Sequence, residues 1–224
     1  GIYYTPTFVT QYIIEQAVGG WLNDRKQEIG FATLPELLPS DYASIKFISK
    51  GKKKGQLQCN DKIKSHINAW ESYKIALSSI KVLDPACGSG AFLNEVFDYL
   101  YQEGQRVNTE LTTLYGGQMD LFRWETYILA NNLYGVDINQ ESVEITKLAL
   151  WLKTANPFEK LTYLDENIKC GNSLIADSSV KNSTYFNWQK EFPKIVKNGG
   201  FDVVVGNPPY GAILSDCELD FLKK

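Results

Sequence analysis

Three short apolar segments, residues 80–83, 133–136 and 201–205, each run into residues that cannot continue a strand. Asp84-Pro85 follows the first segment, an aspartate follows the second, and a glycine, an asparagine and two prolines follow the third. Stretches with helical periodicity separate the three. Short apolar strands that alternate with helices of about 10–15 residues are typical of a parallel sheet with helical crossovers. The alternation therefore predicts an α/β fold whose sheet is mostly parallel.

The segment before the first strand has a different pattern. Residues 10–22 and 61–79 place apolar side chains at helical spacing, although Gly19-Gly20 weakens the end of the first helix. We therefore divide the chain into a helical part, residues 1–79, and an α/β part, residues 80–224.

Within the α/β part we expect two helices, a weaker strand and two irregular connections. The order along the chain is helix 91–105, connection 106–122, helix 139–154, strand 167–170 and connection 177–198, which Trp188 and Phe192 pin to the core. The predicted buried face of the second helix contains Val143, Ile145, Leu148, Ala149 and Leu152.

Composition excludes several classes of protein. A content of 44% hydrophobic and 22% charged residues is ordinary for a globular chain. No run of 18 apolar residues predicts a membrane span, and the first residues lack the pattern of a secretory signal. Four cysteines without a CxxC pair and a single histidine argue against a zinc site or a disulfide framework. We therefore expect reduced thiols, no metal and a cytoplasmic location.

Charge is distributed unevenly along the chain. The net charge is −3, yet residues 46–64 contain seven lysines and one aspartate. The overall balance argues against a protein that coats nucleic acid, because neutralising phosphates requires clustered basic residues. The lysine-rich stretch is either a solvated loop or a loop that contacts phosphates.

A glycine-containing loop, DPACGSGAFL, joins the first strand to the next helix at residues 84–93. Gly88 and Gly90 permit backbone torsions and close approaches that a side chain would block, and the loop feeds a helix amino end. Neither GxxxxGK[ST] nor GxGxxG is present, so nucleotide triphosphates and dinucleotides are not indicated. Asp84 could contact an ammonium, and Asp137 could accept the two hydroxyls of a ribose. S-adenosylmethionine combines a sugar with an amino-acid cation and lacks a pyrophosphate.

Asn207-Pro208-Pro209-Tyr210 follows the last strand. The two prolines cannot extend a ladder, and each restricts the residue before it to extended geometry. The segment is therefore stiff, and it presents one amide and one aromatic ring at the rim of the sheet.

Together these motifs resemble a known family. YYTP, DPACGSGAFL, YGVDIN, CGNSL and NPPY, in that order, resemble the gamma-type DNA adenine N6-methyltransferases, and within them the methylase part of type IIG restriction–modification enzymes. The resemblance implies a Rossmann-like, S-adenosylmethionine-dependent methyltransferase fold. Residues 80–224 would then be the first half of the catalytic domain, with the sheet incomplete at its C-terminal side and the recognition domain missing.

The resemblance also implies roles for individual residues. Tyr4, Thr5 and Pro6 would hold the methionine end of the cofactor, and Asp84, Ala86, Gly88 and Gly90 would line it. Asp137 would bind the ribose, Ile138 would pack on the adenine, and Asn172, where many relatives have an acid, would read that adenine. Phe92 would cover the cofactor or serve as a core residue. Asn207 and Pro208 would accept hydrogen bonds from an exocyclic amine, Pro209 would stiffen the loop, and Tyr210 would stack on the base.

The implied reaction is methylation of adenine N6 in double-stranded DNA. The target base must be flipped out of the duplex, because its amine cannot be reached inside. The alternatives are a protein glutamine-amide methyltransferase, a modification subunit of a type I system, and a DNA-binding module without catalysis. We expect a fragment of this kind to bind cofactor weakly and to methylate DNA poorly without the rest of the enzyme.

Overall fold

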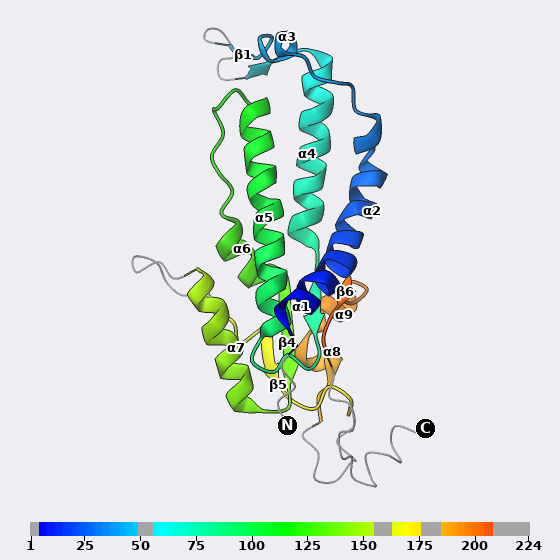
Figure 1. Cartoon of the computed structure of the whole chain (residues 1–224), viewed down its shortest axis with the longest axis vertical. Helices are drawn as coiled ribbons and strands as arrows, with labels where there is room; N and C mark the ends of the chain where they lie inside the picture. The colour runs from blue at the N-terminus through cyan, green and yellow to red at the C-terminus, as the bar shows by residue number, and fades with distance from the viewer. Residues whose placement is uncertain (1–4, 49–55, 155–162, 176–184, 208–224) are drawn as a thin grey trace.

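The computed structural model describes residues 5–48, 56–154, 163–175 and 185–207. A four-stranded sheet with the order β5-β4-β3-β6 lies at one end of the molecule (Figure 1). Its strands are β3 (Val82–Asp84), β4 (Leu133–Asp137), β5 (Ile168–Cys170) and β6 (Val203–Val204). All three pairings are parallel, and Leu83 aligns with Tyr134 on one side and with Val204 on the other. The predicted α/β fold with a parallel sheet is confirmed.

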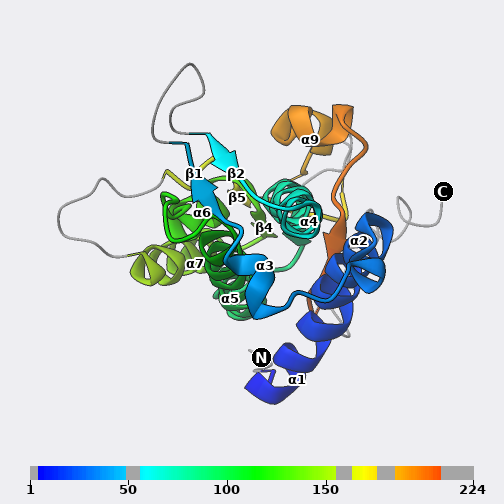
Figure 2. The same ribbon diagram turned by 90° about the horizontal axis from the view of Figure 1, so that it is seen from above.

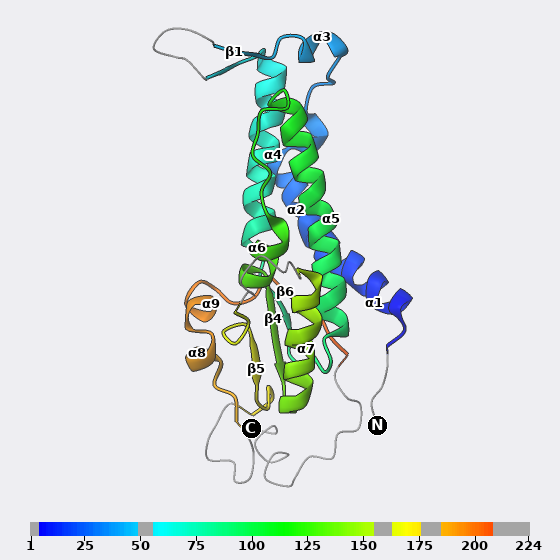
Figure 3. The ribbon, with the colours of Figure 1, turned by 90° about the vertical axis from the view of Figure 1, so that its left-hand side faces the viewer.

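Helices cover both faces of this sheet. The helices α5 (Ala91–Leu114) and α7 (Gln140–Lys153) lie on one face, and α8 (Trp188–Glu191) and α9 (Pro193–Lys197) lie on the other (Figure 3). The helix α6 (Trp124–Asn131) precedes β4 and packs against it. The result is the three-layer arrangement of a Rossmann-like methyltransferase fold.

The N-terminal part forms a helical bundle with α5. It comprises α1 (Thr7–Ile14), a π-helical stretch (Glu15–Gly19), α2 (Gly20–Ile29), a 3₁₀ turn (Phe31–Thr33), α3 (Pro39–Tyr42), the hairpin β1 (Lys46–Phe47) and β2 (Leu57–Gln58), and α4 (Asp61–Ser79). Figure 2 shows α4 and α5 nearly end-on beside the sheet. With 24 residues, α5 is about 36 Å long, so the bundle extends far beyond the strands.

One apolar core runs through both parts. It extends from Ile14 and Val18 in the N-terminal helices through Tyr73 in α4 to Val203 at the sheet. A second, smaller core lies under α8 and α9 on the opposite face. It is built around Leu83, Tyr134, Val136, Phe186 and Phe192, with Trp188 packed edge-on against Phe186. The expected anchoring role of Trp188 and Phe192 is confirmed.

Local sequence explains where several helices begin and end. The side chain of Asn60 accepts a hydrogen bond from the Ile63 amide (2.9 Å), which caps α4. The side chain of Asn139 caps α7 in the same way, accepting from the amides of Glu141 and Ser142. Gly30 ends α2 in the left-handed conformation, with φ of 89°.

The predicted end of the first helix is wrong. The sequence predicts an end at Leu22, weakened by Gly19-Gly20, whereas a π-helical stretch carries the helix through both glycines into α2 and on to Ile29. Gly19 has a packing role there, since a Cβ atom would lie 2.5 Å from the Tyr99 hydroxyl.

The predicted helix 91–105 is too short, because α5 continues to Leu114 and only the rest of the expected connection 106–122 is irregular before α6. Gly104 is internal to the helix and lies under the Trp124 ring, where a Cβ atom would come within 2.4 Å. The glycine therefore serves close packing and does not break the helix.

The buried face of α7 also differs from the prediction. Ile145, Leu148 and Leu152 are 51%, 55% and 76% exposed. The buried residues are Val143, Thr146, Lys147 and Leu150. Lys147 can be buried because it pairs with Glu144 and Asp165. Two polar residues, Thr146 and Lys147, therefore lie on the buried face, which the periodicity had assigned to apolar side chains.

Candidate active site

Several of the predicted site residues that the structure describes lie at the carboxyl edge of the sheet, the lower edge in Figure 1. Asp84 ends β3, Asp137 ends β4, and Asn207 follows β6. Because β3 and β6 are parallel neighbours, the loops after them leave the sheet on the same side. A Cβ atom built on Gly206 would lie only 2.7 Å from Asp84 Oδ1. The glycine loop and the start of the NPPY segment are therefore in direct contact.

The glycine loop is held from two sides. The Gly88 amide donates to Asp137 Oδ2 at 2.8 Å, and the Gly88 carbonyl accepts from Thr146 Oγ1 at 2.8 Å. Gly88 and Gly90 both have positive φ, 52° and 86°. A Cβ atom on Gly90 would lie 3.0 Å from Thr146, whereas one on Gly88 would meet nothing within 4 Å. The backbone of Gly88 is thus held by hydrogen bonds. A side chain at position 90 would contact Thr146, whereas the side-chain direction of Gly88 is open to a ligand among the described residues.

Thr146 was not predicted as part of the site. It is fully buried in α7 and joins this helix to the glycine loop. One feature of the sequence could have indicated its burial. Thr146 lies three residues after Val143 and four before Leu150, so helical spacing places it on the same face as these two apolar residues.

Asp84 is almost completely buried, at 1% exposure. Its Oδ1 atom accepts a hydrogen bond from the Ala86 amide at 3.0 Å, which ties the strand end to the loop. Burial raises the pKa of Asp84 to about 7, and the nearby charge of Asp137 adds to the shift, while the Ala86 hydrogen bond opposes it. This carboxyl group therefore titrates near neutral pH.

Asp137 orders two backbone amides and is partly exposed. Its Oδ2 accepts from Gly88, and its Oδ1 accepts from the Asn139 amide at 2.9 Å. A carboxylate has about four acceptor positions, so Asp137 retains capacity for ligand hydroxyls. Ile138, the next residue, is 62% exposed and offers an apolar surface beside it.

Asn207 contacts the N-terminal motif. Its Nδ2 atom donates to Thr5 Oγ1 at 3.1 Å, across 202 residues of sequence. Pro6 follows Thr5 and precedes the first turn of α1. With the amide nitrogen directed at Thr5, the amide oxygen of Asn207 is the atom left to accept from a substrate. Tyr4, Pro208, Pro209 and Tyr210 lie outside the described residues.

Phe92 and Asn172 are both buried candidates. Phe92 is 4% exposed and belongs to the main core, so the core alternative accounts for its position. Asn172 is 8% exposed, and its Oδ1 accepts from the Leu174 amide at 3.1 Å. Contact of either residue with a cofactor stays a prediction.

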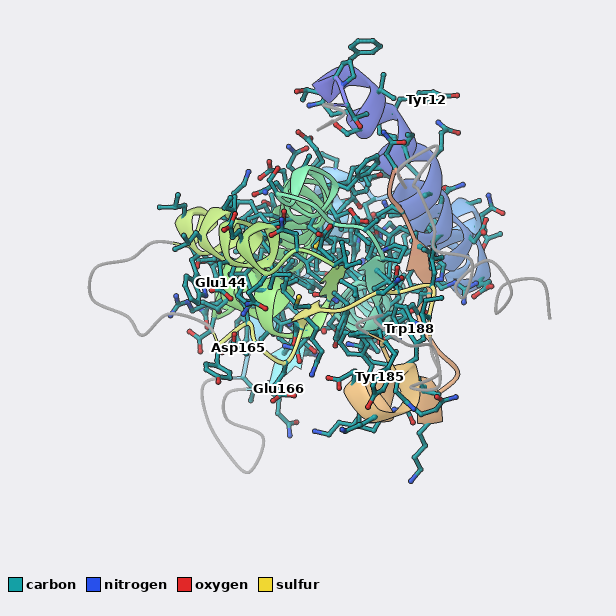
Figure 4. All side chains as sticks on the ribbon, turned by 90° about the horizontal axis from the view of Figure 1, so that it is seen from below. Tyr12, Glu144, Asp165, Glu166, Tyr185 and Trp188 are labelled. Carbon is teal, nitrogen blue, oxygen red and sulfur yellow. The ribbon has the colours of Figure 1, made fainter. Side chains whose placement is uncertain are left out.

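The edge of the sheet has two flanks (Figure 4). Tyr12 on α1 lies on one side, and Tyr185 and Trp188 lie on the other, next to α8. Among the described residues, no group of three or more histidine, cysteine or acidic side chains could hold a metal ion. No helix in the described ranges is long and apolar enough to cross a membrane.

Comparison with known proteins agrees with this geometry. Residues 131–223 match the model of the Eco57I restriction-modification methylase family. The chain is 31% identical over 193 residues to RM.MjaORFECS2P of Methanocaldococcus jannaschii, described as a candidate type II restriction enzyme and methyltransferase. That alignment covers 78% of this chain and 14% of the relative.

Two further relatives have related names. Identity is 31% to the type II restriction enzyme and methyltransferase RM.Eco57I of Escherichia coli, over 67% of this chain and 17% of the relative. It is 27% to the adenine-specific methyltransferase BrxX of Escherichia coli, over 66% of this chain and 10% of the relative. The chain thus spans a small part of the length of each. Residues 131–223 are therefore similar to the Eco57I restriction-modification methylase family.

Proposed function

We propose that the protein containing this chain transfers a methyl group from S-adenosylmethionine to the N6 amine of adenine in DNA. One observation carries the proposal: Gly206, which directly precedes the predicted amine ligand Asn207, packs against Asp84 at the start of the glycine loop, on the same edge of the sheet. The name of one relative, an adenine-specific methyltransferase, supports adenine as the target.

The open side of the glycine loop fits the proposed cofactor. A ribose needs a hydroxyl acceptor, and Asp137 has acceptor capacity beyond its two backbone partners. An adenine ring needs an apolar face, and Ile138 exposes one next to that carboxylate. Among the described residues, no atom lies within 4 Å of a Cβ position built on Gly88. When bound, the cofactor supplies an electrophilic methyl group on a sulfonium.

Asn207 addresses the chemical difficulty of the reaction. The lone pair of an exocyclic amine is delocalised into the ring, so the amine is a poor nucleophile until it is oriented. The side-chain oxygen of Asn207 and the Pro208 carbonyl would accept its two hydrogens and would stabilise the positive charge that develops on nitrogen. Thr5 would fix the Asn207 amide by taking the hydrogen bond from its nitrogen.

Held at Asp137, Ile138 and the glycine loop, the cofactor would supply its methyl group to the nitrogen lone pair oriented by Asn207, and the carbon–sulfur bonding pair would stay with the departing thioether. The methylated amine then loses one proton to solvent. Holding the reacting atoms in line supplies much of the remaining rate advantage. Tyr210 would stack on the flipped base, and recognition of the target sequence would come from other parts of the full-length protein.

The test uses the full-length protein, DNA and S-adenosylmethionine labelled in its methyl group. The DNA is digested to nucleosides and the label is located. We expect label in N6-methyl-2′-deoxyadenosine with the wild type, and about a hundred- to a thousandfold less with Asn207→Ala, because the amine loses its orienting acceptor. Asn198→Ala is the matched control, since Asn198 is an exposed asparagine nine residues earlier. Label in cytosine or in protein would overturn the proposal.

A further inference from the structure

Gly206 lies between β6 and Asn207, and its packing indicates a role for this glycine. We propose that Gly206 is a positioning residue, whose lack of a side chain sets the distance between the glycine loop and the amide of Asn207. The inference rests on the proposed function for its catalytic consequence and on packing alone for its structural part.

The contact at Gly206 is closer than any side chain permits. A Cβ atom there would lie 2.7 Å from Asp84 Oδ1, 3.4 Å from its Cγ and 3.7 Å from Pro85 Cδ. Gly206 also has φ of 155°, which side chains rarely tolerate. The backbone of this residue therefore lies directly against the end of β3.

Asp84 cannot easily give way. It is 1% exposed, and the Ala86 amide holds the same Oδ1 atom that the new Cβ would strike. The backbone of Asp84 is fixed as well, because it is paired with Gly135 within the sheet. A side chain at position 206 would therefore displace the segment that carries Asn207.

Such a displacement would change the distance between the Asn207 side chain and the glycine loop. The Val205 amide is anchored to the Leu83 carbonyl at 2.9 Å, so the shift must be taken up after residue 205. Asn207 would move away from Asp84 and Ala86 and would strain its 3.1 Å contact with Thr5. A misplacement of about 1 Å can lower a rate about a hundredfold. Binding of the methyl donor at Gly88 and Asp137 would change little, because neither residue touches position 206.

The test compares Gly206→Ala with Gly200→Ala in the full-length protein. Gly200 lies before β6 and also has positive φ (99°), but a Cβ atom there meets nothing within 4 Å. We expect Gly206→Ala to lower kcat about a hundredfold, and to change the Kd of S-adenosylhomocysteine, measured by calorimetry, less than about threefold. Gly200→Ala should keep kcat within about threefold of the wild type. An unchanged kcat in Gly206→Ala would overturn the proposal.

A double variant tests the contact itself. In the Asp84→Ala background the obstructing carboxylate is gone and only the strain of the positive φ at position 206 remains, so Gly206→Ala should lower kcat and Tm by less than it does in the wild-type background. Thermal unfolding of the full-length protein decides the matter even if Gly206→Ala alone does not fold, because the double variant should then unfold at a measurable Tm below that of Asp84→Ala. Additive effects would contradict the inference. If the wild type transferred no methyl group, the proposed function would fail while the Tm comparison would still report on the contact.

Discussion

Two carboxyl groups with little exposure, Glu103 in the helical bundle and Asp84 at the edge of the sheet, are held in opposite ways. Glu103 Oε2 accepts from Lys26 Nζ at 2.8 Å and from the Tyr73 hydroxyl at 2.6 Å. Burial works to raise its pKa, but these two hydrogen bonds and the charge of Lys26 hold it below the usual value of 4.5. The bundle thus satisfies its polar groups internally.

Asp84 has one backbone donor and a like charge nearby, and burial raises its pKa to about 7. Its other neighbour is the unsubstituted backbone of Gly206. The edge of the sheet therefore keeps a poorly compensated acid, two glycines with positive φ and a tight loop contact in one place. Such features cluster at functional sites, while well-satisfied networks serve the fold. The comparison supports the proposal that the edge of the sheet carries the chemistry while the bundle contributes to stability.

The largest expected effect tests the bundle. Trp124 is completely buried and packs over Gly104, so Trp124→Ala should lower the free energy of unfolding by about 3–5 kcal/mol. Denaturant unfolding measures this. Leu121→Ala is the control, because Leu121 is 65% exposed, and its free energy should change by less than about 0.5 kcal/mol. Equal losses in the two variants would show that the bundle does not carry stability.

The next largest effect is the pH dependence of the free energy of unfolding that Asp84, at the edge of the sheet, should cause. Because the pKa of Asp84 is raised from 3.8 to about 7, the folded state holds a proton that the unfolded state has lost between these values. Stability contributed by this group is therefore full below about pH 4 and falls as the pH rises to about 7, by roughly 1.4 kcal/mol per pKa unit. Asp84→Asn keeps an acceptor for Ala86 and should remove that slope. A slope that persists in urea titrations from pH 4 to 8 would contradict the assignment.

Glu103 should show the opposite slope. Since its pKa is lowered, the stability it contributes is present above about pH 4.5 and is lost as the pH falls below that value. Glu103→Gln removes the charge that pairs with Lys26 and should cost about 1–3 kcal/mol at pH 7. Glu36→Gln is the matched control, because Glu36 is exposed. If both variants unfold at the same denaturant concentration, the network contributes nothing.

The smallest effect concerns orientation within the site. Thr5→Val removes the hydrogen bond to Asn207 Nδ2, which is worth about 0.5–1.5 kcal/mol, so kcat should fall about three- to tenfold. Thr5→Ser retains the hydroxyl and should keep most of the activity. Steady-state methyl transfer by the full-length protein measures both, and equal rates for Thr5→Val and wild type would show that the contact does not position the amide.

Sequence predicted the fold where local signals and tertiary packing agree. The bounds of α4 were predicted correctly, because its helical pattern begins directly after the Asn60 cap. The strands β3, β4 and β6 were found because each lies in a short apolar run that leads into an aspartate or into the Gly-Asn-Pro-Pro sequence. The length of α5 and the buried face of α7 could not be predicted, because Gly104 and Lys147 break local rules that only Trp124, Glu144 and Asp165 explain.

Some features of the candidate site could be predicted from the sequence, and others depend on tertiary packing. The positions of Asp84, Asp137 and Asn207 at one edge follow from the strand order and from the parallel sheet. Thr146 and the contact of Gly206 with Asp84 depend on how α7 and β6 pack, so no motif contains them. Their discovery required the arrangement of elements that lie far apart in the sequence.

The most direct test of the account is a crystal structure of the full-length protein with S-adenosylhomocysteine. If methyl transfer takes place at this edge of the sheet, the ribose of the ligand should lie at Asp137 and its adenine against Ile138. The sulfur of the ligand should face the side-chain oxygen of Asn207. A ligand bound along the helical bundle, or with its sulfur turned away from Asn207, would contradict the assignment of methyl transfer to this edge of the sheet.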